Sequence, residues 1–203
     1  RGLGDVYKRQ LEGSIFIAGA GVQWLRDKIR LIDNAYETEK IAKSKKNSKG
    51  VYVVPAFTGL GAPYWNSKSR GLIMGLTRDS DWRDLVRATI ESVAYQTSDL
   101  FLSMRKDGLN PKSVKVDGGM VSNNWFVQFL SEILKIKITR SKINETTALG
   151  AAYMAGYQTG IYRSLSDIKQ NWKKDRDFKP KFNKSYRNKL LQGWQQAIKK
   201  TLA

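Results

Sequence analysis

The stretch SVKVDGGMVSNN, residues 113–124, has the pattern of a strand that runs through a tight turn into a helix. SVKV is a β-rich run, Gly118 and Gly119 form the turn, and Ser122 can cap the helix that follows. The glycines have no Cβ and a helix start offers unpaired amides, so a nucleotide and its phosphates can lie against this backbone, with Asn123 as a hydrogen-bonding partner. Taken alone, the pattern fits an ordinary tight turn at least as well.

Helices and strands continue to alternate after this stretch. The helix capped at Ser122 has a buried stripe that includes Trp125 and Phe129, which we expect to be core and not a cofactor site. ETTALGAAYMAGYQTG, residues 145–160, is a helix that Asn144 can cap, and its small residues predict close packing against a neighbouring backbone. The remaining expectations are a strand over 136–139 and, after a polar connector, an amphipathic terminal helix over 184–203.

The segments before residue 113 also alternate between helices and strands. Ser80 or Asp81 can cap a long helix that ends near Gly108. The polar residues 34–49 are expected to form an exposed, partly helical excursion. We also expect a short strand over 11–14, a helix from there to about residue 32, and strands within 50–57 and 71–76. This alternation predicts an α/β protein with a mixed or parallel sheet flanked by helices.

Composition limits the chemistry. The chain has 203 residues, of which 41% are apolar, enough for one domain. It has no cysteine and no histidine, which excludes disulfides, thiolate metal sites and histidine catalysis within these residues. The longest apolar stretch, residues 15–22, is too short to span a bilayer, so we expect a soluble, cytoplasmic protein.

The net charge of +18 raises the alternative of a basic nucleic-acid-binding module. The lysines are scattered, however, and no aromatic platform or nucleic-acid-binding signature is interleaved with them. A solvated basic surface is the preferred interpretation, with no nucleic acid as a partner.

The first ten residues, RGLGDVYKRQ, match neither helical nor strand periodicity and join abruptly onto the patterned segment at Leu11. We expect residues 1–10 to be a non-native leader and residues 11–203 to be one domain.

Several segments together carry a resemblance to a known family. VDGGMVSNN resembles the adenosine-binding motif shared by sugar kinases, actin and Hsp70, and GLIMGLTRDSDWRDLVRATIES, residues 71–92, resembles the C-terminal signature of the FGGY carbohydrate kinases. EGSIFIAGAGVQWLRD, residues 12–27, and VYVVPAFTGLGAPYW, residues 51–65, are similar to the branch of that family that phosphorylates glycerol. The resemblance implies a ribonuclease-H-like ATPase fold, of which this chain is an incomplete C-terminal domain.

The resemblance also implies a nucleotide site. Gly19 and Gln23 match family positions on the adenine-nucleotide side, Gly119 and Asn123 match the nucleotide-binding glycine and asparagine, and Gly118 supports the same turn. The residue chemistry agrees, because Gly19 lets a base approach the start of a helix and Gln23 offers a donor and an acceptor. The implied ligands are ATP and Mg²⁺, with no metal ligand from this chain.

In the family, the catalytic carboxylate and the glycerol-binding residues lie upstream of Leu11, in a first domain that this chain lacks. The resemblance therefore implies no catalytic residue here, an isolated chain without kinase activity, and a homo-oligomeric complete enzyme. A kinase of another polyol or sugar is the alternative within the family.

Other residues that could be considered for a catalytic or binding role have structural explanations. We expect Glu91 to pair with Arg87 one helical turn earlier, and Asp117 to shape the turn or to influence metal-bound phosphates through water. The polar and aromatic residues of the loop 58–70 are expected to serve loop architecture, although the loop can flank a cleft.

Overall fold

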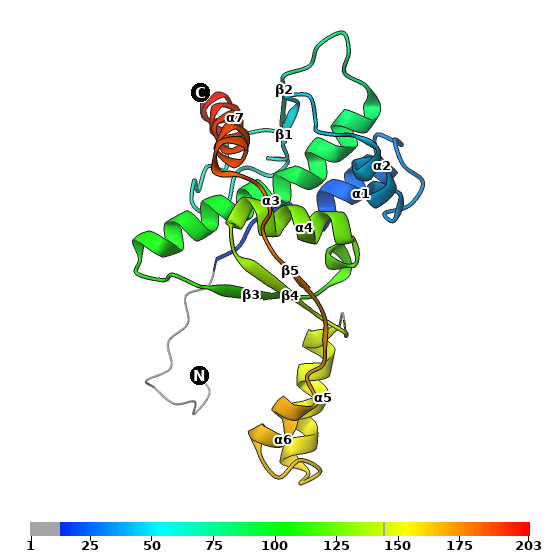
Figure 1. Ribbon diagram of the computed structural model, residues 1–203, viewed down its shortest axis with the longest axis vertical. Helices are drawn as coiled ribbons and strands as arrows, with labels where there is room; N and C mark the ends of the chain where they lie inside the picture. Colours follow the sequence, from blue (N-terminus) through cyan, green and yellow to red (C-terminus); the bar gives the residue numbers. More distant parts are fainter. Residues whose placement is uncertain (1–12, 144) are drawn as a thin grey trace.

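A computed structural model describes residues 13–143 and 145–203 of the chain (Figure 1). The described part is an α/β protein, as the alternating pattern predicted. Its helices are α1 (Gly19–Asp27), α2 (Glu37–Ser44), α3 (Trp82–Lys106), the short 3₁₀ helix η1 (Gly119–Ser122), α4 (Asn124–Leu134), α5 (Thr146–Gln158), α6 (Leu165–Gln170) and α7 (Lys184–Leu202). Its strands are β1 (Tyr52–Val54), β2 (Leu72–Met74), β3 (Ser113–Val116), β4 (Lys137–Ser141) and β5 (Lys174–Phe178).

The strands form two small sheets. β3, β4 and β5 lie side by side in that order, with β4 parallel to β3 and antiparallel to β5, so the sheet is mixed. Helix α4 connects β3 to β4 and packs on both β4 and β5. β1 and β2 form a separate antiparallel pair, with Val53 opposite Ile73. The mixed sheet flanked by helices is confirmed.

Helix α3 is the axis of the core. Asp81 caps it, because its side chain accepts from the Arg83 amide while Asp84 accepts from the Asp81 amide at 2.9 Å, a reciprocal capping box. Of the two predicted caps, Asp81 is the correct one. The helix contacts α1, α2, α4 and β1, and it ends before Gly108, whose φ of 90° suits glycine.

The terminal helix α7 belongs to the core. Trp194 is fully buried and stacks on Tyr95 of α3 with ring centroids 5.4 Å apart. Its indole Nε1 donates to Asp99 at 2.6 Å, and the same carboxylate accepts from Tyr64 and Gln195. One buried acid therefore joins α3, α7 and the loop after β1.

Several elements differ from the sequence prediction, and the expected polar connector before the terminal helix contains α6 and β5, the latter paired with β4. The first helix covers Gly19–Asp27 and not residues 15–32, since the chain turns at Arg30, whose φ is 57°. The expected strand over 11–14 lies partly outside the described residues, and residues 13–14 are not in a strand. Helix α4 is capped by Asn123 and not by Ser122, because Ser122 closes η1 first.

The excursion over residues 34–49 is only partly exposed. Its helical part is confirmed as α2, but Thr38, Ile41 and Ala42 of that helix are buried against α3 and α4. The prediction of an exposed segment was wrong for this face. The segment is rich in lysine, but Thr38, Ile41 and Ala42 lie at helical spacing and form one buried face.

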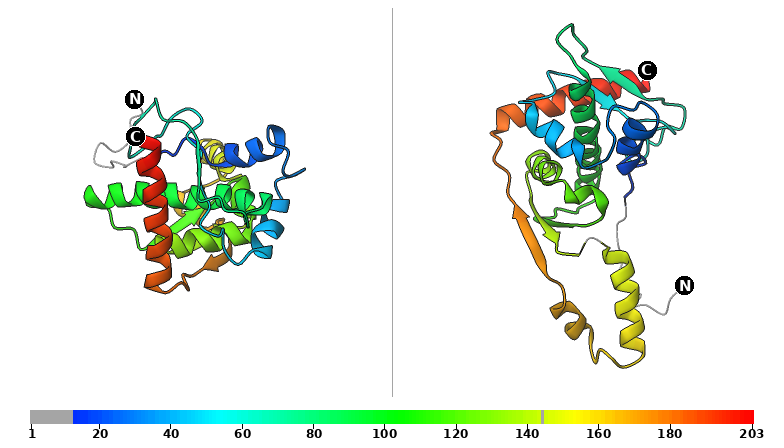
Figure 2. Two further views of the ribbon diagram at one scale, coloured as in Figure 1. Left: turned by 90° about the horizontal axis from the view of Figure 1, so that it is seen from above. Right: turned by 90° about the vertical axis from the view of Figure 1, so that its right-hand side faces the viewer.

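Helices α5 and α6 form an arm that projects from the body (Figures 1 and 2). The expected close packing of the small residues of α5 is not found among the described residues. Gly156 alone is buried in α5, and it packs on Tyr162 within the same arm. The proposed Asn144 cap lies outside the described residues.

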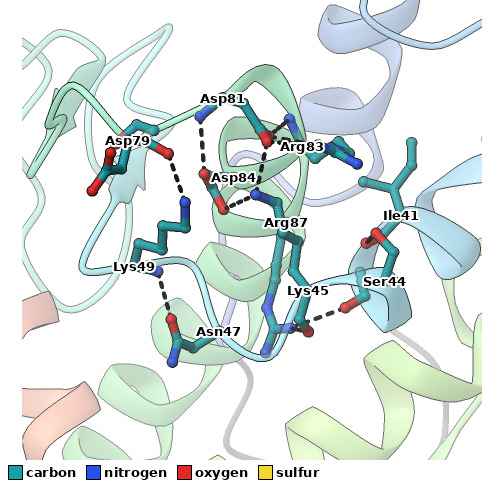
Figure 3. Close-up of polar contacts among 12 residues, drawn as sticks. Ile41, Ser44, Lys45, Asn47, Lys49, Asp79, Asp81, Arg83, Asp84 and Arg87 are labelled. Atoms are coloured by element: carbon teal, nitrogen blue, oxygen red, sulfur yellow. Dashed lines mark hydrogen bonds and ion pairs between the residues drawn. The ribbon is translucent and has the colours of Figure 1, made fainter.

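Charged groups fasten α2 to the start of α3 (Figure 3). Lys45, just after α2, pairs with Asp81 at 2.8 Å and with the fully buried Asp84 at 3.0 Å. Arg87 donates to the Ala42 carbonyl at 2.9 Å and to the Lys45 carbonyl. The position of α2 is therefore fixed by contacts along the first turns of α3.

This network predicts a pH-dependent effect of Asp81→Asn. The hydrogen bond from Arg83, followed by that from Lys45, lowers the pKa of Asp81 below its ordinary value of 3.8. The folded state then keeps the carboxylate ionised to lower pH than the unfolded state, so its stabilisation is present above pH 3.8 and is lost as the pH falls further.

Asn keeps the capping oxygen and removes only the charge. We therefore expect the variant to be less stable than wild type by no more than about 1 kcal/mol at pH 7, with the difference shrinking below pH 4. Urea unfolding between pH 7 and 3 measures it. Asp79→Asn is the control, since Asp79 forms no ion pair within the described part of the chain. A difference that stays constant with pH would show that the charge of Asp81 is immaterial.

Candidate functional site

A cavity of about 640 Å³ lies between α1, the turn before α2, and the η1 segment. Four of the five predicted site residues line it, namely Gly19, Gln23, Gly119 and Asn123. Gly118 directly precedes Gly119 but does not line the cavity itself. The volume is within the range of small-ligand pockets. Segments that are about a hundred residues apart in the sequence thus meet at one site.

The diglycine turn leaves the cavity open. Gly118 has a φ of 90°, a conformation that favours glycine on backbone grounds alone. Gly119 does not, and a Cβ built on it would meet no atom within 4 Å. Neither backbone strain nor packing therefore requires glycine at position 119. The absence of a side chain there is consistent with a ligand that approaches the backbone closely.

Asn123 has two structural partners at the cavity wall. Its Oδ1 accepts from the Phe126 amide at 2.8 Å and caps α4, while its Nδ2 donates to Thr38 Oγ1 at 3.2 Å. An amide nitrogen carries two hydrogens, so one more acceptor can be bound. The side chain predicted to bind nucleotide is thus held in place by the fold.

The turn before α2 and the first turn of α2 supply a wall that no sequence motif predicted. Asn34, Ala35, Tyr36, Thr38 and Glu39 all line the cavity. The Glu39 carboxylate accepts from the backbone amide and the side chain of Asn124, at 3.2 and 3.3 Å. Burial acts to raise the pKa of Glu39, but the hydrogen bonds from Lys43 and Asn124 together lower it.

The sequence contains one local signal for this wall. Asn34 and Glu37 are three residues apart, which is the spacing of a helix-capping pattern. Proximity to the diglycine turn depends on tertiary structure, and no local pattern reports it.

One part of the cavity lining, its floor, is apolar. Val22 of α1, Ile90 of α3 and Met120 of η1 line it. Val22 and Ile90 are almost completely buried and belong to one core cluster with Met120 packed against it. A planar apolar group such as a nucleobase suits this floor, with the polar groups of Gln23 and Asn123 at its edge.

The other candidate residues lie outside the cavity. Glu91 is buried and its Oε1 is 2.7 Å from Arg87 Nε, so the predicted pair is present. Asp117 is exposed. In the loop 58–70, Arg70 donates to three backbone carbonyls of the loop itself, which agrees with loop architecture. Trp125 stacks on Phe129 at 5.1 Å, as core residues do.

No cluster of three or more acidic, histidine or cysteine side chains suited to a metal ion occurs in residues 13–143 and 145–203. None of the helices in this described part is long and apolar enough to cross a membrane.

The fold and site define the class of protein to which the chain is similar. Over 94% of its length it matches the crystal structure of Plasmodium falciparum glycerol kinase with ADP, at a TM-score of 0.85 and 40% identity, covering 38% of that chain. It also matches ligand-bound xylulose kinase from Lactobacillus acidophilus over 92% of its length, at a TM-score of 0.75 and 22% identity, covering 38% of that chain. The fold is therefore that of the sugar kinases.

Sequence comparison narrows the class. Residues 5–159 match the C-terminal domain of the FGGY family of carbohydrate kinases. The chain belongs to this family. It is 54% identical over 190 residues to glycerol kinase 1 of Pseudomonas aeruginosa, and 53% identical over 188 residues to glycerol kinase of a Marinomonas species. These matches cover 94% and 93% of the chain but 38% of each relative, so the chain spans about two fifths of their length.

Proposed function

We propose that this chain forms the nucleotide-binding part of an ATP-dependent glycerol kinase. The observation that carries the proposal is the cavity where Gly19, Gln23, Gly119 and Asn123 meet over an apolar floor. The similarity to glycerol kinases at about half of all positions, and to one of known structure solved with ADP, supports the choice of substrate and nucleotide.

In the complete enzyme, the γ-phosphoryl group of ATP passes to a terminal hydroxyl of glycerol and yields glycerol 3-phosphate. Phosphoryl transfer depends mainly on positioning and on stabilising charge. In this reaction the chain holds the adenosine against α1 and η1, and the phosphates point toward the remainder of the enzyme. The catalytic base and the glycerol-binding groups are supplied from outside these residues, and we expect the chain alone to be inactive.

We expect Mg²⁺ to bind together with the nucleotide. It prefers oxygen ligands, keeps several waters and is commonly held through substrate phosphates. As the family resemblance implies, we assign no residue of this chain to the ion. Following the family resemblance, we also place the enzyme in the cytoplasm and expect a homo-oligomer.

Gly119→Ala tests the nucleotide site. A methyl group there clashes with nothing in the fold, so we expect the free energy of unfolding to change by less than about 0.5 kcal/mol. It protrudes where a ligand would approach, so the Kd for ATP is expected to rise at least about tenfold, or about 1.4 kcal/mol. Ligand-observed NMR on the 203-residue chain measures even weak binding.

Gly150→Ala is the matched control, since that glycine on α5 also has open space around it but does not line the cavity. Equal ATP affinities for wild type and Gly119→Ala would remove the diglycine turn from the site. No detectable ATP binding to the wild-type chain at millimolar concentration would contradict the proposed function of the chain itself.

A further inference from the structure

Tyr36 is an exposed aromatic residue at the wall of the cavity. Its exposed fraction is 83%, the highest among the large apolar side chains exposed in the described residues. Among those residues, its ring has no aromatic partner and its hydroxyl has no hydrogen-bond partner. Trp65, also highly exposed, at least packs on Phe16 at 6.4 Å. The fold therefore gives the Tyr36 ring no packing role.

The backbone that carries Tyr36 is held firmly. Asn34 and Glu37 bond reciprocally across it: the Asn34 amide donates to Glu37 Oε1 at 3.0 Å, and the Glu37 amide donates to Asn34 Oδ1 at 3.3 Å. Thr38 Oγ1 also donates to the Ala35 carbonyl at 2.6 Å. A ring presented on such a fixed turn loses less conformational entropy on binding than one on a flexible loop.

Two contacts from the first turn of α2, which directly follows Tyr36, fix this part of the chain opposite the diglycine segment. Asn123 Nδ2 donates to Thr38 Oγ1 at 3.2 Å, and the Asn124 amide donates to Glu39 Oε2 at 3.2 Å. The turn that bears Tyr36 and the segment that bears Gly119 are thereby joined as two walls of one cavity. All three of Tyr36, Val22 and Ile90 line this cavity, Tyr36 as an exposed side chain and the other two as buried ones.

We propose that the Tyr36 ring stacks on the base of the bound nucleotide and closes the open side of its pocket. This inference rests on the proposed function and adds a residue that selects for the base. An aromatic ring offers a planar apolar face, and stacking of a base on such a ring stabilises binding without hydrogen-bond readout. A purine, with its larger surface, benefits more than a pyrimidine, so Tyr36 contributes to the preference for ATP over CTP or UTP.

The test compares Tyr36→Ala with Tyr36→Phe in the 203-residue chain by ligand-observed NMR with ATP and with adenosine. Loss of the ring should raise the Kd of both ligands at least about fivefold, whereas Phe should stay within about twofold of wild type. An NOE between the Tyr36 ring protons and adenine H8 or H2 should be present in the wild type. CTP binding should be weakened less than ATP binding by Tyr36→Ala.

Tyr157→Ala is the matched control, an exposed tyrosine on the projecting arm that does not line the cavity. Affinity of Tyr36→Ala for ATP within twofold of wild type, or equal losses for Tyr36→Ala and Tyr157→Ala, would overturn the stacking role and leave the proposed function intact. Wild-type protein that binds neither ATP nor adenosine would overturn both. Equal losses for ATP and CTP would overturn the role in base selection.

Discussion

Replacing Arg87 by methionine should lower the free energy of unfolding by about 3–5 kcal/mol, because the change leaves the Glu91 carboxylate buried without its cation. Both side chains are almost fully buried, and Arg87 also lies over the Trp125 ring at 4.7 Å. Burial raises the pKa of Glu91 despite the opposing influence of Arg87, which shows how unfavourable this position is for an isolated charge. Chemical unfolding of the purified chain measures the loss.

A second substitution distinguishes the effect of the unpaired Glu91 charge from the effect of losing the other contacts of Arg87. Adding Glu91→Leu to Arg87→Met should recover at least half of the lost stability, because an apolar pair replaces an unpaired charge. Arg26→Met is the control, since Arg26 pairs with Asp27 at 2.6 Å on the surface, where an ion pair is solvated, and its loss should leave the free energy of unfolding close to that of wild type. Similar losses for Arg87→Met and Arg26→Met would contradict the structural role given to Arg87.

Trp194→Ala should have an effect of the same size. Its fully buried side chain fills the core between α7 and α3, and truncation of such a residue costs about 3–5 kcal/mol. Trp194→Phe keeps most of the ring but removes the donor to Asp99, for which about 1–3 kcal/mol is expected. Thermal or urea unfolding followed by circular dichroism measures both variants.

The exposed Trp65 provides the control for this experiment. It is 71% exposed, so Trp65→Ala should change the free energy of unfolding by less than about 0.5 kcal/mol. A loss of under 1 kcal/mol for Trp194→Ala would show that α7 is dispensable to the core, contrary to the packing described above.

Most of the secondary structure could be predicted from local patterns. Asp81 and the buried stripe after it identify α3, and SVKV followed by two glycines identifies β3 and its turn, because capping and periodicity are properties of neighbouring residues. The motifs also predicted four residues that line the cavity, namely Gly19, Gln23, Gly119 and Asn123.

What failed depends on tertiary contacts. Whether Ser122 or Asn123 caps α4 is decided by η1, a single short turn that no pattern in the sequence distinguishes. The wall from Asn34 to Glu39 reads as polar surface, yet Thr38 and Glu39 bond to Asn123 and Asn124, 85 residues further along the chain. The small residues of α5 indicate suitability for close packing but not the surface on which packing occurs.

The most direct test of the central claim is an assay of the complete gene product. The complete coding sequence that contains this chain would be recovered from the source DNA, and its product assayed for ATP-dependent phosphorylation of glycerol alongside other polyols and sugars. Glycerol 3-phosphate as the preferred product, with the Gly119→Ala enzyme showing a raised KM for ATP, is the predicted result. A complete product that binds no ATP, or that phosphorylates another substrate and leaves glycerol unchanged, would contradict the account.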